Sequence, residues 1–177
     1  MRKPSGSIVG ALSCTTVLMF IGAFAGCAGE TRNSAMKCAT GCPGAELELG
    51  TGIDRFEPTK DGVSTSLYRG PQGGIMVFLA VRTRGIQPDD VRLCYHGETL
   101  TPSVTISEGC WRFNLDPGGE AGRFQRTAVW GQLATEYWSA PEPLFDKDAR
   151  FNVTVTDACG CTANDARTMH IERGVRE

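Results

Sequence analysis

The chain has 177 residues, of which 18 are basic and 20 acidic, so its net charge is −2, and 41% of it is hydrophobic. This length and composition fit one globular domain with additional segments. Its Lys and Arg residues form no block or basic amphipathic stretch, so nothing marks it for binding nucleic acid or anionic lipid through charge.

The N-terminus has the order of a secretory signal. Arg2 and Lys3 precede an uncharged apolar stretch at residues 8–24, and small residues follow. We therefore assign residues 1–26 to a signal peptide helix that is not part of the mature domain. Its removal takes away two basic residues and no acidic one, which changes the net charge from −2 to −4.

The end of this segment reads Phe24-Ala25-Gly26-Cys27. It resembles the lipobox of bacterial lipoproteins, in which two small residues precede a cysteine that is acylated and becomes the new N-terminus. The pattern prefers leucine where this chain has Phe24. The resemblance implies that Cys27 carries the lipid and anchors the chain to a membrane of the bacterial cell envelope. Ala28 is not the aspartate that retains some lipoproteins at the inner membrane, which favours the outer membrane.

Two other fates of the signal segment stay open. The sequence Ala23-Phe24-Ala25 also fits an ordinary signal cleavage site, which would give a soluble secreted protein. Alternatively, the segment is retained as an uncleaved anchor, for which its apolar stretch is at the short limit.

The mature chain is predicted to be rich in strands. Residues 27–44 are small and polar and are expected to form a flexible tether, followed by one domain over residues 45–174. The longest apolar run, at residues 73–85, is bounded by glycines and predicts a buried central strand. Residues 134–148 are predicted to be a loop, and further strands are predicted at residues 45–49, 63–68, 91–95, 103–106, 110–115, 128–133, 151–157 and 162–171.

The last predicted hairpin carries a family resemblance. Residues 153–163 read Val-Thr-Val-Thr-Asp-Ala-Cys-Gly-Cys-Thr-Ala. This string resembles the terminal hairpin of bacterial immunoglobulin-like repeats of the PKD type, with the recurring pattern V-T-V-T-D-x-x-G-x-T-A. The resemblance covers this hairpin alone. Together with the regular short strands, it implies an all-β fold, a single immunoglobulin-like antiparallel β-sandwich. It does not fix a function, because this fold supports many.

The cysteines predict disulfides. Apart from Cys14 and Cys27, the chain has Cys38, Cys42, Cys94, Cys110, Cys159 and Cys161. In an exported protein such cysteines are typically disulfide-bonded. Cys94 and Cys110 lie on two predicted strands separated by a loop and are predicted to pair. The two close-spaced pairs at the ends of the set could cross-link the tether to the last hairpin. The alternative is a four-thiolate zinc site, but their C-x3-C and C-x-C spacings differ from the usual C-x2-C.

Two further groups of residues are weighed as binding sites. Four aspartates in predicted loops or turns could bind calcium, but solvated charges are the simpler interpretation: Asp146, Asp148, Asp157 and Asp165. Trp111 and Trp130 lie in strand patterns and are expected in the core. Trp138, beside a proline-containing loop, is the candidate binding aromatic.

The sequence contains no familiar catalytic motif. We therefore expect no enzyme, cofactor or metal, and no small-molecule substrate. The expected function is that of a membrane-anchored lipoprotein presenting a non-catalytic binding or structural module, with another envelope or surface protein as a candidate partner. The alternative is a soluble secreted domain that binds carbohydrate or protein through Trp138, or, less favoured, a metal-binding module.

Overall fold

The computed structural model describes Cys38 and residues 41–177. The predicted signal peptide, Cys27 and most of the predicted tether lie outside these residues. Within the described part, the chain is all-β with two short 3₁₀ helices. Its elements are β1 (Glu46–Thr51), β2 (Glu57–Pro58), β3 (Val63–Arg69), β4 (Ile75–Arg84), β5 (Val91–Leu100), β6 (Ser103–Phe113), β7 (Asp116–Pro117), β8 (Arg123–Gln132), η1 (Thr135–Tyr137), η2 (Glu142–Leu144), β9 (Lys147–Thr156) and β10 (Thr162–Arg176).

The strands are joined in one hydrogen-bonded path, β2-β1-β4-β3-β10-β9-β5-β6, with β8 on β4 and β7 on β8. The predicted central strand is confirmed as β4, which pairs with β1, β3 and β8. All pairings are antiparallel except that of β3 with β10. Because β3 pairs with both β4 and β10, it connects two limbs of the sheet: a first limb (β1, β2, β4, β7, β8) and a second limb (β5, β6, β9, β10).

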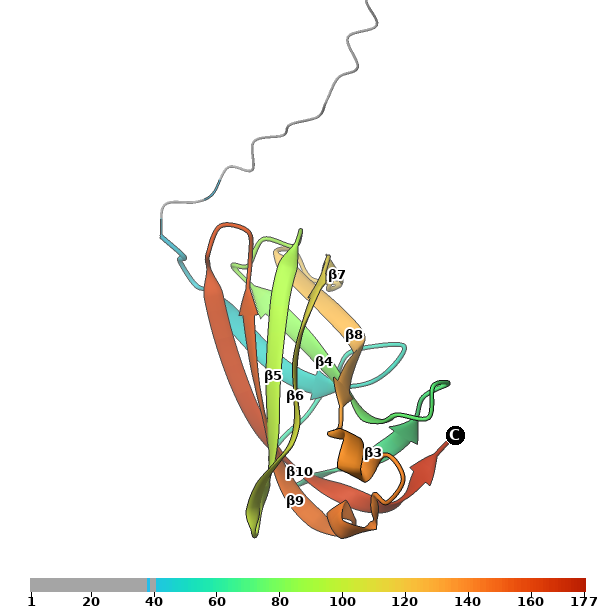
Figure 1. The fold of residues 1–177 in the computed structure, drawn as a ribbon. Helices are drawn as coiled ribbons and strands as arrows, with labels where there is room; N and C mark the ends of the chain where they lie inside the picture. The colour runs from blue at the N-terminus through green and yellow to red at the C-terminus, as the bar shows by residue number, and fades with distance from the viewer. Residues whose placement is uncertain (1–37, 39–40) are drawn as a thin grey trace, which may run out of the picture. The chain divides into compact units, whose positions relative to one another are not determined.

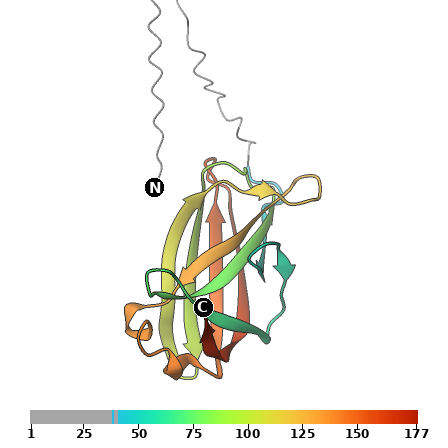
Figure 2. The same ribbon diagram turned by 90° about the vertical axis from the view of Figure 1, so that its right-hand side faces the viewer.

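The two limbs enclose a common core (Figures 1 and 2). Leu79 and Val81 from β4 belong to the same buried cluster as Leu93 from β5 and Phe151 and Val153 from β9. In β9, alternate residues are buried, as the period of two along a strand requires when one face covers a core. Burial of this cluster is the main driving force for the fold.

Several strands are longer than predicted, among them β5, β8 and β10, and the two-residue strands β2 and β7 were not predicted. Two regions differ more. Residues 103–113 form one strand, β6, where the sequence predicts two with a break between them. The predicted break falls at residues 107–109, but these residues continue the pairing with β5, and Gly109 lies opposite Tyr95. A side chain at position 109 would meet the Tyr95 hydroxyl oxygen at 2.7 Å, so glycine allows the strand to continue under this ring. The predicted loop at 134–148 contains both 3₁₀ helices and the start of β9.

Within Cys38 and residues 41–177, no helix is long and apolar enough to cross a membrane.

Candidate functional site

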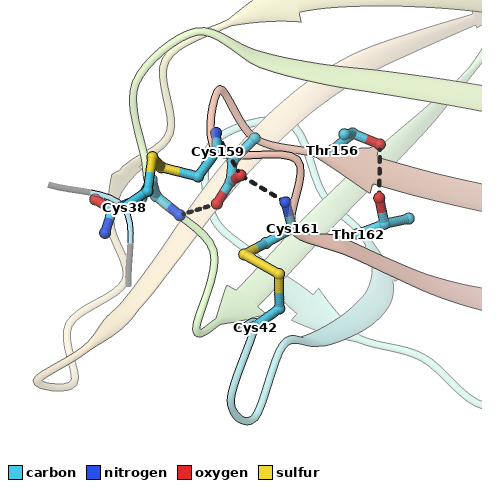
Figure 3. The surroundings of a disulfide bond; sticks show 8 residues. Cys38, Cys42, Thr156, Cys159, Cys161 and Thr162 are labelled. Atoms are coloured by element: carbon cyan, nitrogen blue, oxygen red, sulfur yellow. Dashed lines mark hydrogen bonds between the residues drawn. A yellow bond between two sulfur atoms is a disulfide. The ribbon is translucent and has the colours of Figure 1, made fainter. Parts of the chain in front are cut away.

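Three disulfides use all six cysteines of the mature chain beyond Cys27. Cys94 and Cys110 occupy paired positions on β5 and β6 and are bonded, as the sequence predicts. The two close-spaced pairs of cysteines are cross-linked to one another, which ties the N-terminal segment to the β9–β10 hairpin. The bonds are Cys38–Cys159 and Cys42–Cys161 (Figure 3). Because these four sulfurs are in disulfides, they do not form the four-thiolate zinc site that the sequence left open.

The candidate calcium ligands are not gathered in one place. Asp157 is 5% exposed and accepts hydrogen bonds from the backbone N–H groups of Cys159, Cys161 and Gln87. The other three aspartates have different partners: Asp146 contacts Arg173, Asp148 contacts His170, and Asp165 contacts Arg167. Among the described residues, no three His, Cys, Asp or Glu side chains are grouped as metal ligands.

The predicted burial of two tryptophans is wrong. Trp111 and Trp130 were expected in the core, but they are 40% and 49% exposed. Trp138 is half-buried, and its indole N–H donates to the Leu133 carbonyl at 2.9 Å. The chain has three tryptophans in all, and all three line one cavity. We refer to the surface formed by Trp111, Trp130, Trp138 and Gln132 as the tryptophan groove.

Strand position explains why Trp111 is exposed. It pairs with Leu93, which is fully buried, so both belong to the inward face of the second limb. However, β6 is the last strand of that limb. The facing layer ends here, so the indole is only partly covered. Its N–H donates to the Trp130 carbonyl at 3.0 Å, which connects the free edges of β6 and β8.

Trp130 is exposed for a different reason. Its neighbours Val129 and Gly131 are buried, and its own side chain therefore points to the outer face of β8. Gln132, two residues later, lies on the same outer face and is exposed as well. Position 131 needs a small residue, because a Cβ there would meet the Val77 side chain at 2.9 Å.

Trp138 is placed by contacts between the loop after β8 and the turn before β4. The Arg69 guanidinium donates to the carbonyls of Gly73 and Trp138, at 3.3 Å each. The turn at residues 70–74 is closed by a hydrogen bond from the Gly70 N–H to the Gly74 carbonyl at 2.8 Å. The indole of Trp138 thus has a fixed position within the groove.

Three open cavities follow one another along the groove. The central one, of about 230 Å³, is lined by all three tryptophans together with Met76 and Gln132. A second, also of about 230 Å³, shares Trp111 and Trp130 with it. A third, of about 540 Å³, shares Gln132 and Trp138 with it. The shared residues show that the cavities are adjacent, so the groove offers an extended surface rather than a single closed pocket.

Charged side chains lie only towards the two ends of the groove. In the second cavity, Arg112 is paired with Asp90 at 2.7 Å and Arg126 with Asp116 at 3.6 Å. Glu108 and Glu136 line the third cavity. The central cavity has no Asp, Glu, Lys, Arg or His in its lining. The middle of the groove is therefore aromatic and uncharged.

Tyr95 connects the groove to the core. Its ring is 5% exposed, and its hydroxyl oxygen accepts a hydrogen bond from the Gln132 N–H at 3.2 Å. Burial raises the pKa of Tyr95 above its ordinary value of 10.0, because the anion would lose its hydration. At neutral pH the hydroxyl is therefore protonated.

Sequence reasoning identified Trp138 as the candidate aromatic and missed its two companions. A signal for Trp130 was present: Val129, Gly131 and Leu133 alternate with Trp130 and Gln132, and the polar Gln132 marks the second set as the outer face. For Trp111 the sequence carries no such signal. The alternation of residues around it correctly indicates the inward face of β6, and only the strand order shows that β6 is the last strand of its limb.

No protein-family model matches the chain, and no curated protein matches it.

Proposed function

We propose that this chain is an exported lipoprotein whose immunoglobulin-like domain is a non-catalytic binding module, with the tryptophan groove as its binding site. One observation carries the proposal: every tryptophan of the chain lines the same groove, and two of the three, Trp111 and Trp130, are 40% and 49% exposed. Exposing such large apolar groups to water costs free energy that a monomeric domain normally avoids, and concentrated exposed aromatics are typical of binding surfaces.

The proposed export is supported by the cysteine chemistry. Disulfides persist in oxidising compartments such as the periplasm and the cell surface. Three are present here, and two of them join the segment that follows the proposed signal to the far end of the chain.

The immunoglobulin-like assignment is supported by strand order. The neighbours β1, β4, β8 and β7 correspond in order to strands A, B, E and D of an immunoglobulin sandwich, and β10, β9, β5 and β6 to strands G, F, C and C′. The parallel pairing of β3 with the last strand also fits a first strand that is divided between two sheets.

The anchor is tested by intact mass and fractionation of cells that make the protein. The wild-type chain should be in the outer-membrane fraction and begin at an acylated Cys27. A Cys27→Ala variant should lose the acyl groups and leave the membrane. Cys14→Ala is the matched control, because it removes a cysteine from the same segment outside the lipobox, and it should be acylated normally. A wild-type chain that begins near Gly26 in the culture fluid would instead establish the soluble secreted alternative.

The binding site is tested by co-sedimentation of the non-acylated Cys27→Ala chain with isolated cell envelope. The chain should sediment with this material, and adding Trp130→Ala should abolish most of the binding. Val63→Ala is the control, because Val63 is 38% exposed and lies on β3, outside the groove cavities. Equal sedimentation of the Trp130→Ala and control chains would reject the groove as the binding site.

A further inference from the structure

We infer that the tryptophan groove binds a neutral, linear oligosaccharide chain. This inference rests on the proposed function, and it names the class of ligand from the chemistry of the groove.

The aromatic faces provide the first step of the argument. The N–H groups of Trp111 and Trp138 are held by the carbonyls of Trp130 and Leu133 at 3.0 and 2.9 Å. These bonds fix both indole rings and occupy their polar edges. What remains for a ligand is the flat apolar π-face, which suits the flat C–H face of a sugar ring. Fixed rings also lose little conformational entropy on binding.

The polar groups provide the second step. The lining of the central cavity has no ionisable side chain, and its polar side chains are two carboxamides, Gln72 and Gln132. A carboxamide is both a donor and an acceptor, as is a sugar hydroxyl. The nearby arginines already have partners: Arg69 contacts two carbonyls and Glu177, and Arg112 and Arg126 are paired with aspartates. An anionic ligand would therefore find no free counter-charge at the centre of the groove, whereas a neutral sugar needs none.

The backbone of β8 provides the third step, because it argues against an added peptide strand. The Trp130 carbonyl accepts from Trp111, the Gln132 N–H donates to Tyr95, and the Gln132 carbonyl accepts from Ser107 at 2.7 Å. An extended peptide that joins a sheet edge requires such groups to be free. Along the groove they are occupied, so recognition must use side-chain faces and amides.

The shape of the site provides the last step. The three adjacent cavities form a continuous series along the edges of β6 and β8. A monosaccharide would occupy only one of them. A chain of several sugar units can contact more than one tryptophan at once.

The test uses the envelope co-sedimentation assay with two chemical treatments of the envelope. Periodate cleaves the vicinal diols of sugars, and protease removes proteins. Periodate should abolish Trp130-dependent sedimentation, and protease should leave it unchanged. Sedimentation that resists periodate and is lost after protease would overturn the oligosaccharide inference while the proposed binding function stands. Sedimentation that never depends on Trp130 would reject the proposed function itself.

A second measurement tests neutrality. Oligosaccharides released from the envelope by mild acid are separated by ion exchange into neutral and acidic pools. Because all three tryptophans lie at the groove, intrinsic fluorescence reports directly on its occupation. The neutral pool should cause a saturable change, and Gln132→Glu should weaken its binding at least tenfold because it adds a charge and removes a donor. A saturable change with the acidic pool alone would overturn the inference.

The variants need a control for folding. Trp130→Ala removes an outer-face side chain, so its thermal unfolding should stay close to that of the wild type. Trp111→Phe retains a ring but loses the N–H that holds the Trp130 carbonyl. It should weaken binding less than Trp130→Ala. Val63→Ala should bind as the wild type does, and a comparable loss of binding in this control would overturn the assignment to the groove.

Discussion

The Tyr95 hydroxyl makes stability sensitive to alkaline pH. In the unfolded chain this group loses its proton near pH 10.0, and burial raises its pKa in the folded protein. Between the two pKa values the unfolded state binds fewer protons than the folded state, so the free energy of unfolding falls as pH rises. The contribution of Tyr95 to the free energy of unfolding is fully present below its pKa in the unfolded chain. It is lost as the pH rises towards its pKa in the folded protein.

We therefore expect Tyr95→Phe to reduce this alkaline loss of stability. Urea unfolding is measured for both proteins at a series of pH values on either side of about pH 10. The difference in unfolding free energy between the two proteins should be constant around neutral pH. Above about pH 10 it should shift in favour of the variant. A difference that does not change with pH would contradict the prediction. The variant also lacks the acceptor for the Gln132 N–H, so it should be less stable than the wild type at neutral pH.

Asp157 is the buried charge that organises the β9–β10 turn. One carboxylate oxygen accepts from the Cys159 and Cys161 N–H groups and the other from the Gln87 N–H, at 2.9 Å each. In Asp157→Asn the NH₂ group of the amide would face a backbone N–H, so two donors would meet without an acceptor. We expect this change to lower the free energy of unfolding by about 2–3 kcal/mol. Urea denaturation measures it. Asp89→Asn, in the exposed turn beside Gln87, is the control and should change stability by less than about 0.5 kcal/mol.

At the scale of elements, the β9–β10 hairpin holds the N-terminal segment through two disulfides whose loops overlap in the sequence. They close loops with sequence separations of 121 and 119. Closing a loop of this length restricts the unfolded chain by about 5 kcal/mol, whereas a second bridge beside the first closes a ring of about eight residues and adds only about 2.5 kcal/mol. Each disulfide alone therefore supplies most of the restriction of the unfolded chain that the two supply together.

We expect the loss of both to cost more than the sum of the two single losses. Replacing Cys42 and Cys161 by serine, or Cys38 and Cys159 by serine, should each lower the free energy of unfolding by about 2.5 kcal/mol. Replacing all four should lower it by about 7 kcal/mol. Urea denaturation under non-reducing conditions measures the three variants. Additive losses would show that the unfolded chain is already compact at these positions.

The same elements show what the sequence could predict. The interior strands β4 and β9 were predicted because an apolar run and a strict alternation both require a buried face. The disulfides were predicted from the number of cysteines and from the proposed export of the chain. Trp111 could not be predicted, because its exposure depends on β6 being last in its limb. That order is set by pairing with β5, which is a tertiary contact that no local pattern encodes.

At the scale of the whole molecule, the two limbs meet at their free edges as well as in the core. Ser107 of β6 forms an isolated bridge with Leu133, which follows β8, and the Trp111–Trp130 hydrogen bond lies beside it. The groove therefore exists only when both limbs are folded and packed. An all-β fold was predictable from strand spacing, but a groove shared by strands that lie far apart in the sequence was not.

The proposed anchor and the proposed ligand together predict avidity. Many copies held on one membrane can contact many repeats of one long polysaccharide, and each further contact is then intramolecular. We expect acylated protein in liposomes to dissociate from immobilised envelope polysaccharide at least about a hundredfold more slowly than the non-acylated Cys27→Ala chain.

Short oligosaccharides from the same material are the control, because they reach only one groove and should bind both forms with equal affinity. A biosensor measures both cases. If the two forms left the long polymer at the same rate, membrane-held copies would not be engaging it together. If the acylated and non-acylated forms also differed in their binding of the short ligand, acylation would be changing the affinity of each single groove. Only a slower release confined to the long polymer fits a groove that binds chains from a fixed surface.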